Sequence, residues 1–162
     1  MTEGDFKKTF FLTVFSANCV SNQLAMASPE VSFDSLSPNL IVADVNRSVK
    51  FYKDVLGFTQ IASVPESGTY NWAMVVRGPV TMMFQTLASI KEDVPSLKLS
   101  EGHSAATFYI KVKGLDELMK SVSAKTKLSV ELRTTFYNAR EFAVNDPDGN
   151  VIMFAEDKTA AA

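Results

Sequence analysis

The sequence predicts an α+β protein built from two βαβββ modules. Two observations predict this fold class: one strand, one amphipathic helix and three further strands follow one another twice along the chain, and a shift of 70 residues brings the two sets into correspondence. A chain of 162 residues, 46% apolar and 21% charged, has the composition of a globular protein. At this length roughly 68–70% of the unfolded surface can be buried, so one domain can be stable unaided.

The segment before the domain leaves two interpretations open. In residues 1–27, two lysines precede an apolar run at residues 9–20, and Ala25 and Ala27 suit a cleavage site, as in a secretory signal. Acidic residues ahead of the lysines, and Asn18 inside the run, favour an ordinary N-terminal extension. The run is shorter than the roughly 20 apolar residues of a membrane span. Localisation therefore stays open between the cytoplasm and, with a cleaved signal, the periplasm.

The first module is expected at residues 37–87, after a Ser- and Pro-rich linker at residues 28–36. A β-branched run at residues 39–43 predicts a strand, and Asp44 is a candidate helix N-cap. The helix has one apolar stripe at i, i+4, i+7 and i+11, and Gly57 suits its end. The stripe consists of Val45, Val49, Tyr52 and Leu56. Three strands are expected next, at residues 58–64, 70–77 and 80–86.

The second module is expected at residues 105–158, followed by a short tail at residues 159–162. Its helix carries Leu115, Leu118 and Val122 on one side. Asp146-Pro147-Asp148-Gly149 has Pro and Gly where a β-turn prefers them, so its acids are expected to serve the turn. The strands are expected at residues 105–112, 128–135, 139–145 and 151–156.

An internal duplication explains the repeated order of elements. A shift of 70 residues, taken without a gap, places Leu40 and Val42 on Ile110 and Val112. The same shift makes the further pairs Val45 with Leu115, Trp72 with Phe142, and Met83-Phe84 with Met153-Phe154.

Two segments resemble the glyoxalase/bleomycin resistance protein/dioxygenase (vicinal oxygen chelate) superfamily. They are IVADVNRSVKFYKDVLGF at residues 41–58 and REFAVNDPDGNVIMFAE at residues 140–156. The resemblance implies that the two modules pair their curved sheets around a cleft, often between two chains of a homodimer. The resemblance does not identify the function of this protein, because the superfamily includes isomerases, dioxygenases, epimerases, thiol transferases and antibiotic-binding proteins.

The resemblance also implies four positions for metal ligands, usually His, Gln or Glu. This sequence has Ser37, Met83, Thr107 and Met153 at those positions. A thioether is a soft ligand and a neutral hydroxyl a poor one for the divalent ions concerned. We therefore expect neither a metal nor another cofactor. The single histidine, His103, is expected in a surface loop four residues before Thr107.

Strand alternation divides the side chains between two faces. Leu40, Val42, Ile110 and Val112 are expected beneath the helices. The opposite, concave face is expected to present an apolar floor with a few polar groups, which suits a small, partly apolar ligand. The candidate ligand-binding residues are Asn39, Ile41, Trp72, Thr81, Met83, Gln85, Tyr109, Lys111 and Met153.

Each candidate also has a structural interpretation. Met83 and Met153 can instead close the concave face as core, and an aromatic such as Trp72 in a sheet usually packs. Lys111, near a strand end, is expected to extend to water more than to meet an anionic ligand. Arg140 and Glu141 are expected to have structural roles.

These observations leave three hypotheses for the function. The favoured hypothesis is a metal-free small-molecule-binding protein of the bleomycin-resistance type, which is not an enzyme. The second is a lyase, isomerase or dioxygenase-type enzyme with atypical or no metal ligands, with Lys111 or Tyr109 moving a proton in its metal-free form. The third is a structural or interaction module with a filled cleft. Sixteen basic against eighteen acidic residues, without a basic stripe, argue against nucleic acid as a partner.

Overall fold

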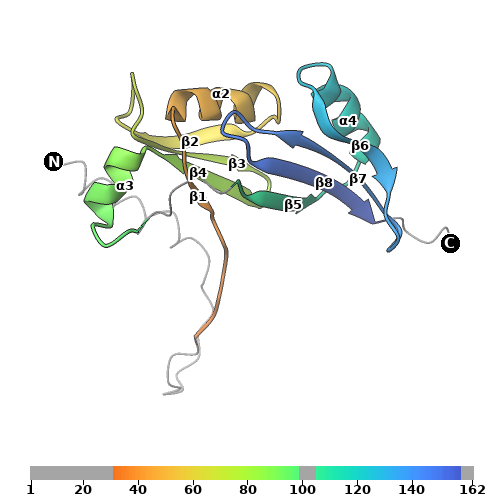
Figure 1. The fold of residues 1–162 in the computed structure, drawn as a ribbon, viewed down its shortest axis with the longest axis horizontal. Coiled ribbons are helices and arrows are strands. Elements are labelled where there is room, and N and C mark those ends of the chain that lie inside the picture. The colour runs from red at the N-terminus through yellow and green to blue at the C-terminus, as the bar shows by residue number, and fades with distance from the viewer. Residues whose placement is uncertain (1–30, 99–104, 158–162) are drawn as a thin grey trace, which may run out of the picture.

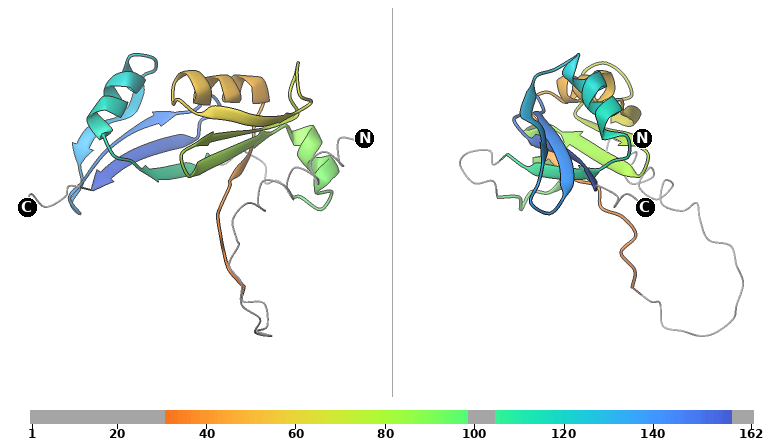
Figure 2. Two further views of the ribbon diagram at one scale, coloured as in Figure 1. Left: turned by 180° about the vertical axis from the view of Figure 1, so that it is seen from behind. Right: turned by 90° about the vertical axis from the view of Figure 1, so that its right-hand side faces the viewer.

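The computed structural model describes residues 31–98 and 105–157. It contains two four-stranded sheets with the strand orders β1-β4-β3-β2 and β5-β8-β7-β6, which confirms the predicted fold class. The first module consists of β1 (Asn39–Ile41), α2 (Val45–Asp54), β2 (Thr59–Val64), β3 (Trp72–Arg77) and β4 (Val80–Gln85). The second consists of β5 (Thr107–Lys111), α4 (Leu115–Ser123), β6 (Leu128–Thr134), β7 (Ala139–Asn145) and β8 (Val151–Asp157). The helices α2 and α4 lie on the same side of the two sheets (Figures 1 and 2).

The two module helices begin in different ways. Asp44 is extended, with φ −146°, and its carboxylate accepts a hydrogen bond from the Arg47 N–H at 3.0 Å, as an N-cap does. Gly114 precedes α4 in the left-handed region, with φ 78°, and makes no side-chain cap. Asp116 and Glu117 in the first turn of α4 instead place negative charge near the positive end of the helix dipole.

A third helix, α3 (Leu87–Asp93), was not predicted from the sequence. The hydroxyl of Thr86 caps it by accepting a hydrogen bond from the Ser89 N–H at 3.2 Å. The helix lies on the side of the first sheet away from α2 (Figure 1). It therefore covers part of the surface that the sequence analysis assigned to a cleft.

The strand registers confirm the 70-residue correspondence for β1, β4, β5 and β8. In β7 they show a different correspondence. Asn39 lies opposite Met83 in the first module, and Tyr109 lies opposite Met153 in the second, as the 70-residue shift requires. Within the antiparallel pairs, however, Trp72 lies opposite Gln85 whereas Glu141 lies opposite Ala155. Glu141 is therefore the counterpart of Trp72, and the predicted pairing of Trp72 with Phe142 is wrong.

The cause is a longer turn in the second module. Residues 77–80 separate the paired residues Val76 and Thr81, whereas residues 146–150 separate Asn145 and Val151, which is one residue more. Because side chains alternate between faces, an error of one residue moves every side chain of a strand to the opposite face.

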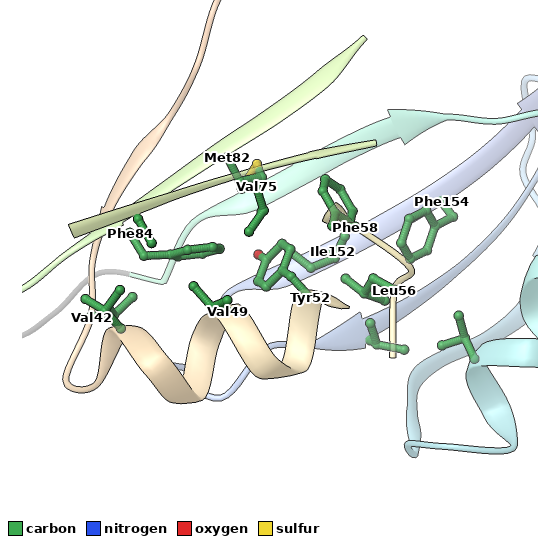
Figure 3. Packing of buried hydrophobic residues seen from close by; sticks show 14 of the residues in the cluster. Val42, Val49, Tyr52, Leu56, Phe58, Val75, Met82, Phe84, Ile152 and Phe154 are labelled. Carbon is green, nitrogen blue, oxygen red and sulfur yellow. The ribbon is translucent and has the colours of Figure 1, made fainter. Parts of the chain in front are cut away.

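The main core lies between the helices and the two sheets and runs through both modules. Tyr52 is fully buried, and its ring contacts those of Phe58 and Phe84 at centroid distances of 5.5 and 4.7 Å. Ile152 and Phe154 of β8 belong to the same cluster (Figure 3). The two modules therefore share one hydrophobic core.

The Asp-Pro-Asp-Gly turn joins the two modules. Asp146 accepts main-chain hydrogen bonds from Asp148 and Asn150 at 3.0 and 2.8 Å, which confirms its expected role in the turn. Asp148 reaches the first module, where it accepts from the Ala43 N–H, the Arg47 guanidinium and the Ser48 hydroxyl, each at 3.0 Å. The turn therefore binds the start of α2 as well as closing its own hairpin.

Candidate functional site

The face of each sheet that points away from α2 and α4 is called here the distal face. The strand registers place all nine predicted ligand-binding residues on it. Their neighbours along the strands, such as Leu40, Phe84, Ile110 and Phe154, belong to the main core, as expected. The structure therefore brings the candidates to one side of the protein, divided between two sheets.

The distal face of the first module is largely buried. Trp72, Met74 and Met83 are only 6%, 4% and 8% exposed, and with Val64 they form a second apolar cluster, against which Ala62 packs. Met83 therefore packs as core, which was one of the two interpretations of this residue.

The polar side chains on this part of the face are already paired. The amide oxygen of Gln85 accepts from Asn39 at 2.7 Å, and its amide nitrogen donates to Ser89 at 3.0 Å and to Asp93 at 2.6 Å. Gln85 is 2% exposed, so its amide nitrogen serves the contact with α3 and its amide oxygen the contact with β1. On this part of the face the apolar side chains are therefore buried and these polar groups are already hydrogen-bonded.

The distal face of the second module is more open. Tyr109 is 45% exposed, and Met153 beside it is half-buried. The Lys111 ammonium forms an ion pair with Asp157 at 2.8 Å, and both side chains are largely exposed. The position of Lys111 agrees with a lysine that extends to water, and a pair this exposed contributes little to stability.

Glu141 is a polar residue of this face whose position the sequence analysis missed. It is 1% exposed, and its Oε1 accepts two hydrogen bonds from the Arg133 guanidinium, at 2.9 and 2.7 Å. Its Oε2 accepts from the Tyr137 hydroxyl at 3.1 Å. The neighbouring Tyr109, followed by burial and the hydrogen bond to Glu141, raises the pKa of Tyr137. The longer turn after β7 was the signal that could have revealed this position.

Arg140, the neighbour of Glu141, faces the other way. Its guanidinium forms a bidentate ion pair with Asp116 at the start of α4. This surface contact agrees with the structural role expected for Arg140.

The residues at the family's metal-ligand positions do not suit a divalent ion. The Ser37 hydroxyl is hydrogen-bonded to that of Thr81 at 2.5 Å, and Thr107 lies opposite Val151. The other two positions are the thioethers of Met83 and Met153. Within residues 31–98 and 105–157, no group of three or more His, Cys, Asp and Glu side chains is arranged to hold a metal. His103 lies outside the described residues.

A groove of about 680 Å³ lies on the helix side, where the two modules meet. Two of its basic lining residues have a structural role, because Lys125 and Arg77 donate to the main-chain carbonyls of Asp54 and Leu56 at the end of α2. None of the described helices has the length and apolar character of a membrane span.

The chain belongs to the glyoxalase/bleomycin resistance protein/dioxygenase superfamily, whose family model matches residues 32–154. It is similar to the bleomycin resistance proteins of Geobacillus stearothermophilus and Staphylococcus aureus. With each it shares 32% identity over 126 residues, which is 72% of this chain and 92% of the relative. The resemblance seen in the sequence is therefore confirmed.

Solved structures show the same fold at low sequence identity. TioX from Micromonospora sp. ML1 has a TM-score of 0.66 at 20% identity, over 76% of this chain and 98% of its own. A lactoylglutathione lyase from Agrobacterium tumefaciens has a TM-score of 0.62 at 15% identity, over 79% and 96%. Since one of these neighbours is an enzyme, the shared fold does not decide between binding and catalysis.

Proposed function

We propose that this protein binds a small, partly apolar molecule without a metal ion. The observation that carries the proposal is the combination of an intact two-module fold with Ser37, Met83, Thr107 and Met153 at the metal-ligand positions. The similarity of this chain to bleomycin resistance proteins supports a binding function. In this proposal the more open distal face of the second module provides the contact, with the half-buried Met153 as an apolar group and the exposed Tyr109 as a polar one.

We further propose that the ligand cleft forms between two copies of the chain, with the first module of one facing the second module of the other. The exposed aromatic residues around the second distal face support this arrangement, because large apolar surface is usually covered in an assembly. They are Tyr109, Phe136 and Tyr137, which are 45%, 100% and 53% exposed.

Light scattering on the full chain tests the assembly. We expect a mass of twice the 17.8 kDa of one chain. Phe136→Ser, which removes apolar surface from a fully exposed position, should shift the mass toward the monomer without loss of secondary structure. A single-chain mass for the unaltered protein would contradict the intersubunit cleft.

Thermal unfolding with bleomycin, and with a panel of planar apolar compounds, tests ligand binding. A ligand present at about 100 times its Kd stabilises the fold by about 2.7 kcal/mol, which raises the Tm of a protein of this size by about 5–10 °C. Met153→Lys should reduce the shift by placing a charge on the distal face, whereas Met153→Leu should retain it. The absence of any shift across the panel would contradict the proposal.

A metal assay separates metal-free binding from a divergent metal enzyme. The purified protein, incubated with Mn²⁺, Fe²⁺, Ni²⁺ or Zn²⁺ and then desalted, should retain less than one equivalent of any ion. One bound ion per chain would contradict the metal-free proposal.

A further inference from the structure

The groove of about 680 Å³ where the two modules meet is called here the helix-side groove. It is lined by residues 55–58 after α2, residues 77–80 between β3 and β4, residues 110–114 from β5 to α4, and one side of α4. Because α2 and α4 lie on this side of the sheets (Figure 1), the groove is separate from the distal face. Its volume falls within the roughly 300–1,000 Å³ that is typical of small-molecule sites.

The apolar part of the lining comes from both modules. Five half-buried apolar side chains line the groove and pack against the main core: Val55, Val80, Ile110, Val112 and Leu118. The first two belong to the first module and the other three to the second, so neither module forms the groove alone. Each of these side chains keeps some contact with water. The apolar body of a ligand would remove that area from water, which is favourable.

The charged part of the lining is mainly positive. Four of the lining residues are cationic and one is acidic, in a chain with a formal net charge of −2. The cations are Arg77, Lys111, Lys113 and Lys125, and the acid is Glu117. A local excess of positive charge in a groove with apolar walls favours an anionic ligand.

Three of the four cations keep a positive charge that no described carboxylate compensates. Lys111 forms an ion pair with Asp157. Lys125 and Arg77 donate to main-chain carbonyls at the end of α2, which are neutral, and an ammonium has three N–H donors and a guanidinium five. Lys113 forms neither an ion pair nor a hydrogen bond with a side chain in residues 31–98 or 105–157. Donors therefore remain for an anion.

We propose that the helix-side groove is a second binding site, for a free small molecule with an apolar body and one anionic group. The apolar body lies against the half-buried side chains of the two modules. Arg77, Lys113 and Lys125 hold the anionic group. This site is separate from the distal face, and the inference does not depend on the binding function proposed there.

Fluorescence titration of the full chain with two probes tests the proposal. The probes are 8-anilinonaphthalene-1-sulfonate and N-phenyl-1-naphthylamine, which share an aromatic body and differ by the sulfonate group. We expect Lys113→Gln to weaken binding of the sulfonate probe about threefold, the effect of losing one exposed ion pair. It should leave binding of the neutral probe unchanged.

A groove-filling variant tests whether the probes bind in the groove. Ser121 is an exposed residue of α4 that lines the groove, so the ring of Ser121→Trp would occupy the groove without entering the core. We expect Ser121→Trp to abolish groove binding of both probes. Ser121→Ala leaves the space open and should retain it. The circular dichroism spectra and Tm values of both variants should match those of the unaltered protein.

Two further variants are controls for net charge and for the other site. Lys120→Gln removes the same charge from an exposed residue of α4 that does not line the groove, so it should leave the binding of both probes unchanged. Met153→Lys alters the distal face. Probe binding that persists in Ser121→Trp but is lost in Met153→Lys therefore belongs to the distal face.

The outcomes decide between the groove and its alternatives. If the unaltered protein does not bind the sulfonate probe, or Ser121→Trp binds it equally well, the groove is not a binding site. If Lys113→Gln weakens sulfonate binding no more than Lys120→Gln does, the groove does not select anions and the proposal is wrong. Neither result affects the function proposed for the distal face, which is measured with bleomycin and with Met153→Lys.

Discussion

Replacement of Asp146 by Ala is expected to lower the free energy of unfolding by about 3–5 kcal/mol, because it leaves several buried donors without a partner. The Asp146 carboxylate is 5% exposed. It accepts from the main-chain N–H groups of Asp148 and Asn150, from the Asn150 side chain at 2.8 Å, and from the Tyr52 hydroxyl at 3.4 Å. Urea denaturation followed by circular dichroism measures the change.

Asp146→Asn is the matched control, because it keeps one oxygen for the two main-chain donors but offers an amide where Tyr52 and the Asn150 side chain donate. We expect it to lose roughly half as much stability as Asp146→Ala. If Asp146→Ala unfolds at the same urea concentration as the unaltered protein, this turn does not hold the hairpin and α2 in place.

Replacement of Tyr52 by Ala is expected to cost about 3–5 kcal/mol, the range for removing a large buried aromatic side chain. The ring is fully buried and contacts Phe51, Phe58 and Phe84. Tyr52→Phe keeps these ring contacts and loses only the hydroxyl, so it should cost about 1 kcal/mol. Equal losses for the two variants would show that the hydroxyl, and not the ring, carries the contribution.

The unaltered protein and Tyr52→Phe are also expected to differ in stability at alkaline pH. Burial of Tyr52, and then its contact with Asp146, raises the pKa of its hydroxyl far above the ordinary value. A raised pKa means that the folded state keeps a proton that the unfolded chain loses, so this contribution is complete below about pH 10 and declines above it. The stability of the unaltered protein should therefore fall more steeply above about pH 10 than that of Tyr52→Phe in urea unfolding.

Local sequence patterns were sufficient to predict helix α2 and the turn at residues 146–149. The N-cap at Asp44 and the apolar stripe through Tyr52 predicted α2, and both are present. The turn at residues 146–149 was predicted from its Pro and Gly. These features depend on residues a few positions apart along one element, which is the range over which periodicity, capping and turn preferences act.

The candidate site could be predicted only in part. Alternation along the strands placed Asn39, Met83, Tyr109 and Met153 on one face, as the registers show. Strand alternation does not distinguish the buried Met83 from the exposed Tyr109, because burial depends on what packs over each sheet. Helix α3 was not predicted either, and it accepts both hydrogen bonds that the Gln85 amide nitrogen donates.

The sequence by itself determined the two-module α+β fold, the family, and the absence of His or acid at the four metal-ligand positions. Tertiary structure alone decided that Asp148 binds the first module across about one hundred residues of chain, and that Glu141 faces away from the helices beside Tyr137. The physical reason is that both depend on strand register. One additional residue in a turn changes which face each side chain of β7 occupies, and only the pairing of strands reveals it.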